Sequence, residues 1–206
     1  MIVEGKIKGF QKGMVYLAKV QDTTLVKVDS VKLDGNNTFT LSDNVESPQI
    51  YFLSISGTNK ILQFFGEKGK ISIISDLKIY GYSPIIKGSK NQEFLDIYRE
   101  TNRKYTNLRL DLIKEKFDAK KEKDTIRVKE IEKEMINILR RKYLYTANFA
   151  VNHADHEVSP YLTLSEIYDA NPKLIDTIVK SLSKDVRQSI YGKKLVAYYE
   201  KQKVKN

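Results

Sequence analysis

The strongest constraint on the fold is a change of hydrophobic period near residue 88. Before that point apolar and polar residues alternate, as in "LVKVDSVKL" (residues 25–33), which is typical of a half-buried β-strand. Beyond it apolar residues recur every three or four positions, which is typical of one face of an α-helix. The sequence therefore predicts an α+β chain with a β domain at 1–88 and a helical domain at 89–206.

Turn signals divide the β domain into about eight short strands at hairpin spacing. The clearest is "DGNN" at residues 34–37, where Asp, Gly and Asn tolerate left-handed backbone conformations and favour a hairpin. Pro48 suits the start of a strand, since its missing N–H costs no ladder hydrogen bond there. We expect an antiparallel β-sandwich or a partly open barrel.

Two apolar stripes predict a long helical hairpin in the second domain. The first stripe consists of Phe94, Leu95, Tyr98, Tyr105, Leu108, Leu112 and Phe117. The second consists of Val128, Ile131, Met135, Ile138 and Tyr143, after a polar turn at 118–124. We expect each helix to bury its stripe on the other helix or on the sheet, although the same stripes could equally mediate a dimer.

The boundary between the domains carries the segment Gly88-Ser89-Lys90. A phosphate-binding P-loop has glycine, four residues, then Gly-Lys-Ser/Thr; here the order differs, and Ser83 stands where the first glycine belongs. We instead predict that Gly88 adopts an unusual φ and that Ser89 caps a helix beginning near Asn91. Gln92, three residues after Ser89, completes the pattern of a capping box.

The net charge of +10 comes from 36 basic and 26 acidic residues and lies mostly in the helical domain. Basic surfaces attract nucleic acid, anionic lipid or acidic glycans. The densest basic cluster is Arg140, Arg141 and Lys142, followed by two tyrosines that could stack on bases. Glutamates interleave with lysines just upstream, which favours a solvated face of paired charges over a nucleic-acid site.

Both histidines, His153 and His156, lie in the segment "NHADHEV" beside two carboxylates. They are candidate metal ligands, but their spacing differs from the four-residue spacing of helical zinc sites and the sequence offers no third remote ligand. The chain has no cysteine, which excludes disulfides, thiolate metal sites and thiol catalysis within it. We therefore predict neither a bound metal nor a cofactor.

No catalytic residue can be assigned from the sequence. The chain has no Gly-x-Ser-x-Gly elbow, and its histidines share one polar segment. A carboxylate-based enzyme is an alternative, because Asp29, Asp34, Asp43 and Glu46 lie in the β domain. These acidic residues lie near expected turns, where such residues are common without catalysis. Nucleic-acid binding through the basic cluster is the other alternative.

Four segments together resemble a known family. They are "VEGKIKGFQKGMVYLAKV", "VDSVKLDGNNTFTL", "ESPQIYFLSI" and the exit "IIKGSKNQEFLDIY", and later "SPYLTLSEIYD" and "SIYGKKLVAYYEK" look like that family's helical linker. The chain is similar to the β domain of unknown function at the N-terminus of Bacteroidetes envelope proteins, where it often precedes a TlpA-type or peroxiredoxin-related thioredoxin domain.

The resemblance implies an exported protein of the periplasm or outer membrane, with any signal or lipid anchor outside this sequence. The family's redox chemistry resides in a Trp-Cys-x-x-Cys segment, and this chain has neither Trp nor Cys. The resemblance thus implies a non-catalytic binding or interaction module. It could be an accessory domain of a thioredoxin-like thiol-disulfide protein, with a protein or glycan partner in the envelope.

Overall fold

The computed structural model describes residues 1–203 and divides into two compact units, residues 1–93 and the chain from Phe94 onward. The division falls inside the first turn of the first long helix, a few residues beyond the predicted boundary at 88. That turn belongs with the β domain because its side chains bond to the strands, as described below.

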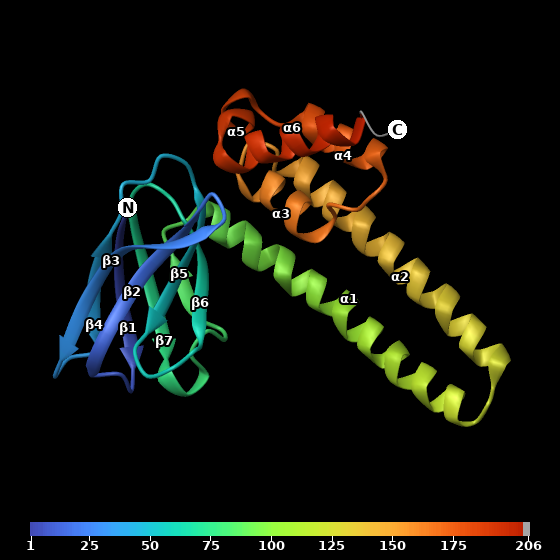
Figure 1. Ribbon diagram of the computed structural model, residues 1–206, viewed down its shortest axis with the longest axis horizontal. Coiled ribbons are helices and arrows are strands. Elements are labelled where there is room, and N and C mark those ends of the chain that lie inside the picture. The colour runs from blue at the N-terminus through green and yellow to red at the C-terminus, as the bar shows by residue number, and fades with distance from the viewer. Residues whose placement is uncertain (204–206) are drawn as a thin grey trace. The chain divides into compact units, whose positions relative to one another are not determined.

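The β unit contains eight strands in two four-stranded sheets. The strands are β1 (Ile2–Lys8), β2 (Lys12–Gln21), β3 (Thr24–Asp34), β4 (Thr38–Ser42), β5 (Gln49–Ile55), β6 (Ile61–Gly66), β7 (Lys70–Asp76) and β8 (Ile85–Lys87). One sheet has the order β4-β1-β7-β8 and the other β3-β2-β5-β6 (Figure 1). The predicted β-sandwich followed by helices is confirmed. All pairs are antiparallel except β1 and β7, which run parallel.

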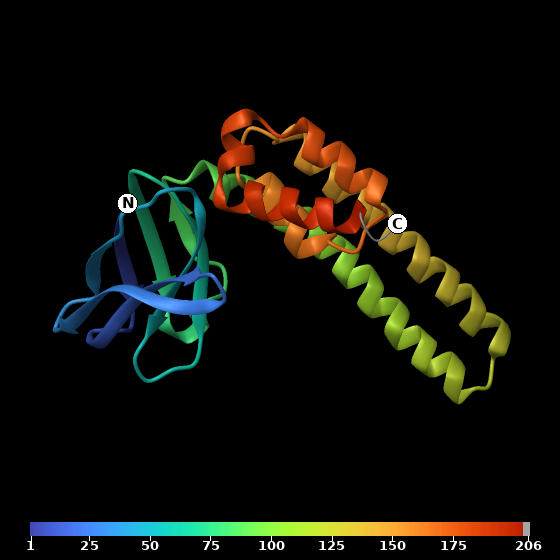
Figure 2. The same cartoon turned by 45° about the horizontal axis from the view of Figure 1, so that its top comes forward.

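The apolar residues that alternate with polar ones along the strands point into the core, and the polar residues between them point to solvent. In β2, Val15 and Leu17 are fully buried, and in β5 Leu53 is fully buried opposite Leu17 in the ladder. Tyr80, after the short 3-10 turn Leu77–Ile79, is also buried, and its hydroxyl donates to the Leu53 carbonyl at 3.0 Å. Inward side chains of both sheets thus form one closed core between the layers visible in Figure 2.

The hairpin predicted at residues 34–37 is wrong. Gly35 does take a left-handed φ of 95° and the chain does turn there, but β3 and β4 belong to different sheets. The turn carries the chain from one layer to the other, and β3 pairs with β2 through the tight turn at Asp22, whose φ is 56°. The turn residues predicted the local bend, while the choice of partner strand depended on the core.

Between Phe94 and Lys203 all regular structure of the second unit is helical. Its helices are α1 (Lys90–Lys121), α2 (Thr125–Asn152), α3 (Val158–Glu166), α4 (Pro172–Ser181), α5 (Lys184–Gln188) and α6 (Ile190–Lys203), the first beginning in the β unit. α1 and α2 form the predicted antiparallel hairpin, whose far end extends beyond the shorter helices (Figure 1). Asp124 caps α2 by accepting the Arg127 N–H at 2.9 Å.

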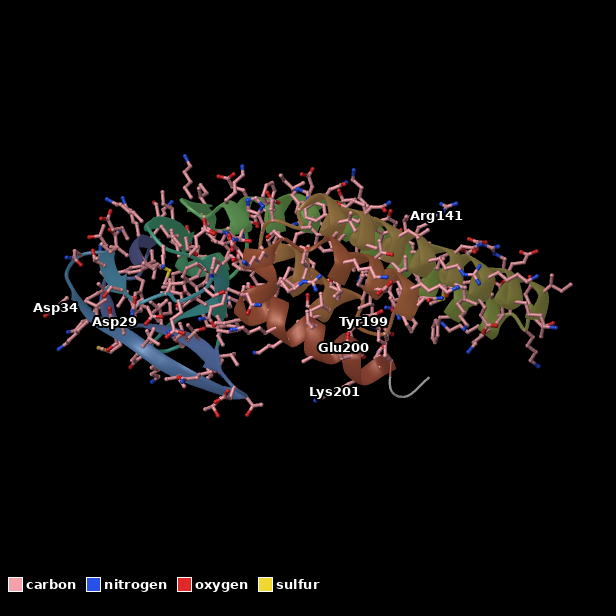
Figure 3. The ribbon with its side chains drawn as sticks, turned by 90° about the horizontal axis from the view of Figure 1, so that it is seen from above. Asp29, Asp34, Arg141, Tyr199, Glu200 and Lys201 are labelled. Atoms are coloured by element: carbon pink, nitrogen blue, oxygen red, sulfur yellow. The ribbon has the colours of Figure 1, made fainter. Side chains whose placement is uncertain are left out.

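Helices α3 to α6 pack against the C-terminal half of α2. Their core includes Ile167, Ile175 and Leu195, all fully buried. Tyr199, labelled on α6 in Figure 3, donates its hydroxyl to Asp176 of α4, and Asp176 also accepts from Lys180. No helix within residues 1–203 combines the length and the apolar character needed to cross a bilayer.

Candidate interaction surface on the helical hairpin

The segment Gly88-Ser89 holds the start of α1 on the β unit. The helix begins at Lys90, one position earlier than predicted, and Ser89 Oγ accepts the Gln92 N–H at 3.1 Å as an N-cap does. Gly88 has a φ of 94°, and a Cβ at this position would lie 2.1 Å from the Lys70 carbonyl oxygen. Only glycine fits this conformation and this close approach without strain.

The side chains around this boundary bond to the sheet. The Gln92 side-chain oxygen accepts the Phe65 N–H of β6 at 2.8 Å. Glu67 accepts the Lys90 N–H at 2.7 Å and the Asn91 amide at 2.8 Å. The N–H groups of Lys90 and Gln92 that a phosphate would need therefore already donate to Glu67 and Ser89, which makes the segment an anchor.

The carboxylates of the alternative enzyme hypothesis hold strands together. Asp43 accepts from the Lys19 ammonium at 2.5 Å and from the Tyr51 hydroxyl at 2.5 Å. Burial, and then the bond to Asp43, raise the pKa of the Tyr51 hydroxyl well above its usual range, so Tyr51 stays a neutral donor. Asp29 accepts the Ser42 N–H at 2.7 Å, and this bond joins β3 to the end of β4.

The other two candidate carboxylates are exposed. Asp34 ends β3 beside its turn, and Glu46 lies in the connection before β5. Figure 3 labels Asp29 and Asp34 at separate positions along β3. Asp29 and Asp43 thus have structural partners, while Asp34 and Glu46 are in solvent, which is the ordinary position for turn acids.

The two histidines enclose an aromatic ring. The centre of the Phe94 ring lies 4.3 Å from that of His153 and 4.8 Å from that of His156. His153 Nδ1 donates to the Phe149 carbonyl at 2.8 Å, and His156 Nδ1 bonds the Asp155 carboxylate at 2.8 Å and lowers the pKa of that carboxyl. Across residues 1–203 the structure brings together no three His, Cys, Asp or Glu residues able to hold a metal.

The basic cluster Arg140-Arg141-Lys142 is distributed around α2. Lys142 is half-buried and donates to Glu166 of α3 at 2.8 Å. Arg140 and Arg141 are exposed, but consecutive residues are separated by about 100° around a helix and cannot share a face. Figure 3 shows Arg141 projecting from α2 on the side away from α3 to α6. The three residues therefore do not form one basic patch.

The seam between α1 and α2 buries only part of the predicted stripes. Leu112 and Ala119 of α1 pack with Ile131 of α2, and Val128, Met135 and Ile138 are half-buried around them. Leu108 and Phe117, which we predicted on the same buried stripe, are instead 51% and 59% exposed. That prediction is wrong because an α-helix has 3.6 residues per turn, which places Leu108 and Phe117 on opposite sides of the seam.

The hairpin consequently exposes many large apolar side chains. Those exposed on the two long helices are Ile97, Leu108, Leu110, Ile113, Phe117, Ile126, Ile136, Leu139 and Leu144. Exposed apolar residues are unremarkable when scattered, but clusters mark contact surfaces. How these side chains are distributed over the two sides of the hairpin therefore decides whether they form a contact surface.

Ion pairs mark the two edges of the seam. On one side Lys116 bonds Glu132 at 2.8 Å and lowers the pKa of that carboxyl. On the other side Arg127 bonds Glu115 at 2.7 Å, and Glu130 and Glu134 each at 3.0 Å. These bonds raise the pKa of the Arg127 guanidinium further, so it is fully charged.

The helical period assigns the remaining residues to one side or the other. The side of the Lys116–Glu132 pair, called here the basic face, carries Arg109, Ile113, Phe117, Lys120, Lys129, Ile136 and Leu139. The side of the Arg127 pairs, called here the acidic face, carries the acidic residues Glu100, Asp111, Asp118, Glu122, Glu130 and Glu134. It also carries Lys104, Lys114 and Arg141, with Leu108 and Leu144. The acidic residues on the basic face are Glu132, which pairs with Lys116, and Asp124 at the tip, which caps α2.

The basic face is hollowed at the tip of the hairpin. A hollow of about 500 Å³ lies there, lined by Ala119, Thr125 and Val128, by the cationic side chains of Lys120, Lys123 and Lys129, and by the carboxylates of Asp124 and Glu132. Glu132 is paired with Lys116, and Asp124 caps α2. Beside the hollow, near the end of α1, the Lys121 ammonium lies over the Phe117 ring, 4.3 Å from its centre. An apolar group with negative charges beside it fits this surface.

Our reading of the sequence missed this surface. The signal was present as a second stripe on α1, Leu110, Ile113 and Phe117, at the i, i+3 and i+7 positions of a helical face. The acidic residues of the outer part of α1 also lie away from that stripe, whereas Arg109, Lys116 and Lys120 recur near it. We grouped apolar residues by approximate spacing alone, which merged two faces into one.

Comparison with known proteins identifies only the first unit. Residues 1–95 match a family described as a domain of unknown function (DUF4369), which confirms the resemblance to a β domain of unknown function for those residues. The match spans the eight strands and the first turn of α1. No curated protein and no solved structure matches the chain.

Proposed function

We propose that this protein is a non-catalytic interaction module whose helical hairpin carries the binding surface. The observation that supports this proposal is the set of exposed large apolar side chains on α1 and α2, which two helices alone cannot cover. Ile113 and Leu139, each 45% exposed, belong to the same basic face although they lie on different helices. Burying such side chains against a partner is favourable by about 25 cal/mol per Å² of apolar surface.

The geometry of the β unit favours binding over catalysis. A carboxylate mechanism needs an acid and a base that both face a substrate. Asp43 instead neutralises Lys19, and Asp29 accepts a backbone N–H that joins strands. Replacing the four candidates by Asp29→Asn, Asp34→Asn, Asp43→Asn and Glu46→Gln, one at a time, tests this in a screen for hydrolytic activity. A hydrolytic activity that any of these changes abolished would contradict our proposal.

We further propose that the module belongs to the cell envelope. The support is the match of residues 1–95 to the domain of unknown function, together with the resemblance of the linker segments to proteins that carry a thioredoxin-like domain. The gene around this sequence tests it directly. A lipoprotein signal upstream and a Trp-Cys-x-x-Cys segment downstream would support an exported accessory domain, and a cytosolic fraction containing all of the protein would contradict export.

Photo-crosslinking in the native host tests the binding surface. A photoreactive phenylalanine analogue at Ile113 probes the basic face, and the same analogue at exposed Asn137 of α2 probes the acidic face. We expect a discrete crosslinked species from Ile113, with a protein or glycan partner, and none from Asn137. Equal yields from both positions, or none from either, would contradict an interaction surface on the basic face.

A further inference from the structure

The base of the basic face already carries part of the chain, and that part is acidic. Glu166, the last residue of α3, accepts from Lys142 of α2 at 2.8 Å and from Asn102 of α1 at 3.5 Å. Asp169, just beyond α3, accepts from the Tyr143 hydroxyl at 2.6 Å. Burial and this bond raise the pKa of Tyr143 to about 12. The molecule thus covers one end of this face with a helix that ends in carboxylates.

The outer end of the same face has a similar chemistry, and within the described residues no helix covers it; only the Lys121 ammonium lies over the Phe117 ring. Ile113, Phe117 and Leu139 are 45%, 59% and 45% exposed. Within residues 1–203, Lys120 and Lys129 make no ion pair, in contrast to Arg127 with its three carboxylates on the acidic face. Cations beside uncovered apolar side chains are complementary to a ligand that carries both apolar groups and acids.

The length of the uncovered surface indicates the size of the ligand. From Leu139 to the start of α2 at Thr125 the helix rises by about 20 Å, at about 1.5 Å per residue. A third helix of about four turns spans that distance, and a helix lying over two antiparallel helices completes a three-helix bundle. The hollow at the tip provides room for an apolar anchor at the end of such a helix.

We propose that the outer half of the basic face binds an acidic amphipathic helix of a partner protein. This inference rests on the proposed function and names the partner's chemistry. The partner's apolar residues lie over Ile113, Phe117 and Leu139, and its carboxylates pair with Lys120 and Lys129. The mode is that of a helix laid into a groove, read through apolar anchors at i, i+3, i+4 and i+7.

Two other occupants fit less well. A flat bilayer is disfavoured because α3 lies on the base of the same face and would hold a membrane away from it. A second copy would bring two basic faces together, with Arg109, Lys120 and Lys129 repelling their equivalents. Both occupants are nevertheless outcomes that the experiment distinguishes.

The test selects ligands without assuming a partner. The full chain is immobilised and screened against a displayed library of random 16-residue peptides. Enriched peptides are synthesised with fluorescein, and binding is followed by anisotropy. The basic-face variant is Ile113→Ser with Leu139→Ser. Its matched control is Leu108→Ser with Leu144→Ser on the acidic face, at exposures of 51% and 53%. Circular dichroism checks that both variants keep the helical content of the parent.

We expect enriched peptides with net negative charge and helical apolar spacing. Their Kd should weaken at least tenfold in the basic-face variant and less than twofold in the control. Lys120→Glu with Lys129→Glu should also weaken binding at least tenfold, and added salt should weaken it because the charges are exposed. Peptides without acidic bias, no enrichment, or equal losses in both double serine variants would overturn the inference.

Two further measurements separate the alternatives. Sedimentation with vesicles containing phosphatidylglycerol tests lipid, and sedimentation equilibrium of the chain alone tests a second copy. The inference would be overturned if the parent chain bound vesicles or self-associated but bound no peptide, and if the basic-face variant lost that vesicle binding or self-association. If crosslinking at Ile113 captured a protein through a segment that is not an acidic helix, this inference would fail while the proposed function stood. No crosslink from Ile113 would count against both.

Discussion

The β unit buries most of its apolar residues, whereas the outer half of the hairpin leaves many of them exposed. Every residue of β5 is buried or half-buried, and its alternate side chains enter a core closed by the second sheet. Between Thr106 and Lys121, by contrast, α1 buries only Leu112 and Ala119. The β unit has a complete core of its own, whereas the outer hairpin has a seam and two exposed sides.

The difference follows from the number of layers. Two sheets packed face to face cover each other's apolar sides, but two helices can cover only one stripe each. Any further apolar stripe stays exposed until a third layer is added, and α3 to α6 add that layer only at the base of the hairpin. Exposed apolar residues at the outer end therefore indicate incomplete packing, which is the feature on which the proposed binding surface rests.

The largest expected difference in unfolding free energy is between the same substitution, leucine to alanine, at a buried and at an exposed position. Leu53→Ala empties a fully buried position of the β core and should cost about 2–5 kcal/mol of unfolding free energy. Leu139→Ala removes a side chain that is 45% exposed and should cost at most about 1 kcal/mol. Urea denaturation followed by tyrosine fluorescence measures both. Similar losses would mean that the outer hairpin is as well packed as the sheets.

The next effect tests the close backbone approach at the boundary. Gly88→Ala places a Cβ 2.1 Å from the Lys70 carbonyl oxygen at a φ of 94°, and should cost roughly 3 kcal/mol. Gly57→Ala is the matched control, with a φ of 82° and nothing within 4 Å of the added Cβ, and should cost only about 1 kcal/mol. Equal costs in urea denaturation would show that φ alone matters at Gly88.

A smaller effect is expected at the helix cap. Ser89→Ala removes the acceptor of the Gln92 N–H and should destabilise the chain by about 1 kcal/mol. Ser165→Ala, at an exposed position of α3, should change stability by at most about 0.5 kcal/mol. Thermal denaturation of the pair distinguishes the capping role from a general effect of replacing serine. An unchanged midpoint for Ser89→Ala would remove the capping role.

The smallest effect lies at the base of the hairpin and depends on pH. Tyr143→Phe removes a bond to Asp169 and should cost about 0.5 kcal/mol at pH 7. The folded-state pKa of Tyr143 is raised from 10.0 to about 12, so its contribution is present below pH 10 and is lost as pH rises toward 12. Denaturation of both proteins at pH 8 and pH 11 should show the difference shrinking; a growing difference would contradict this sign.

Much of the local structure was predictable because its causes are local. The change of period near residue 88 predicted strands before it and helices after it, and Ser89 could be recognised as a cap from its position before an apolar stripe. A turn at 34–37 was predictable for the same reason, since Gly35 needs no neighbour to favour a left-handed φ. Each of these features depends on a few consecutive residues.

The sequence by itself thus determined the two kinds of secondary structure and the boundary between them. Through its lack of cysteine it also excluded disulfides, thiolate metal sites and thiol catalysis. Only the tertiary structure decided that β3 pairs with β2 instead of β4, that β1 lies parallel to β7, and that Phe117 faces solvent while Leu112 faces Ile131. Pairing and burial depend on residues distant in the chain that compete for the same core, and hydrophobic period carries no information about which competitor packs there. The basic face arose from that competition, on the side of α1 and α2 that the seam did not bury.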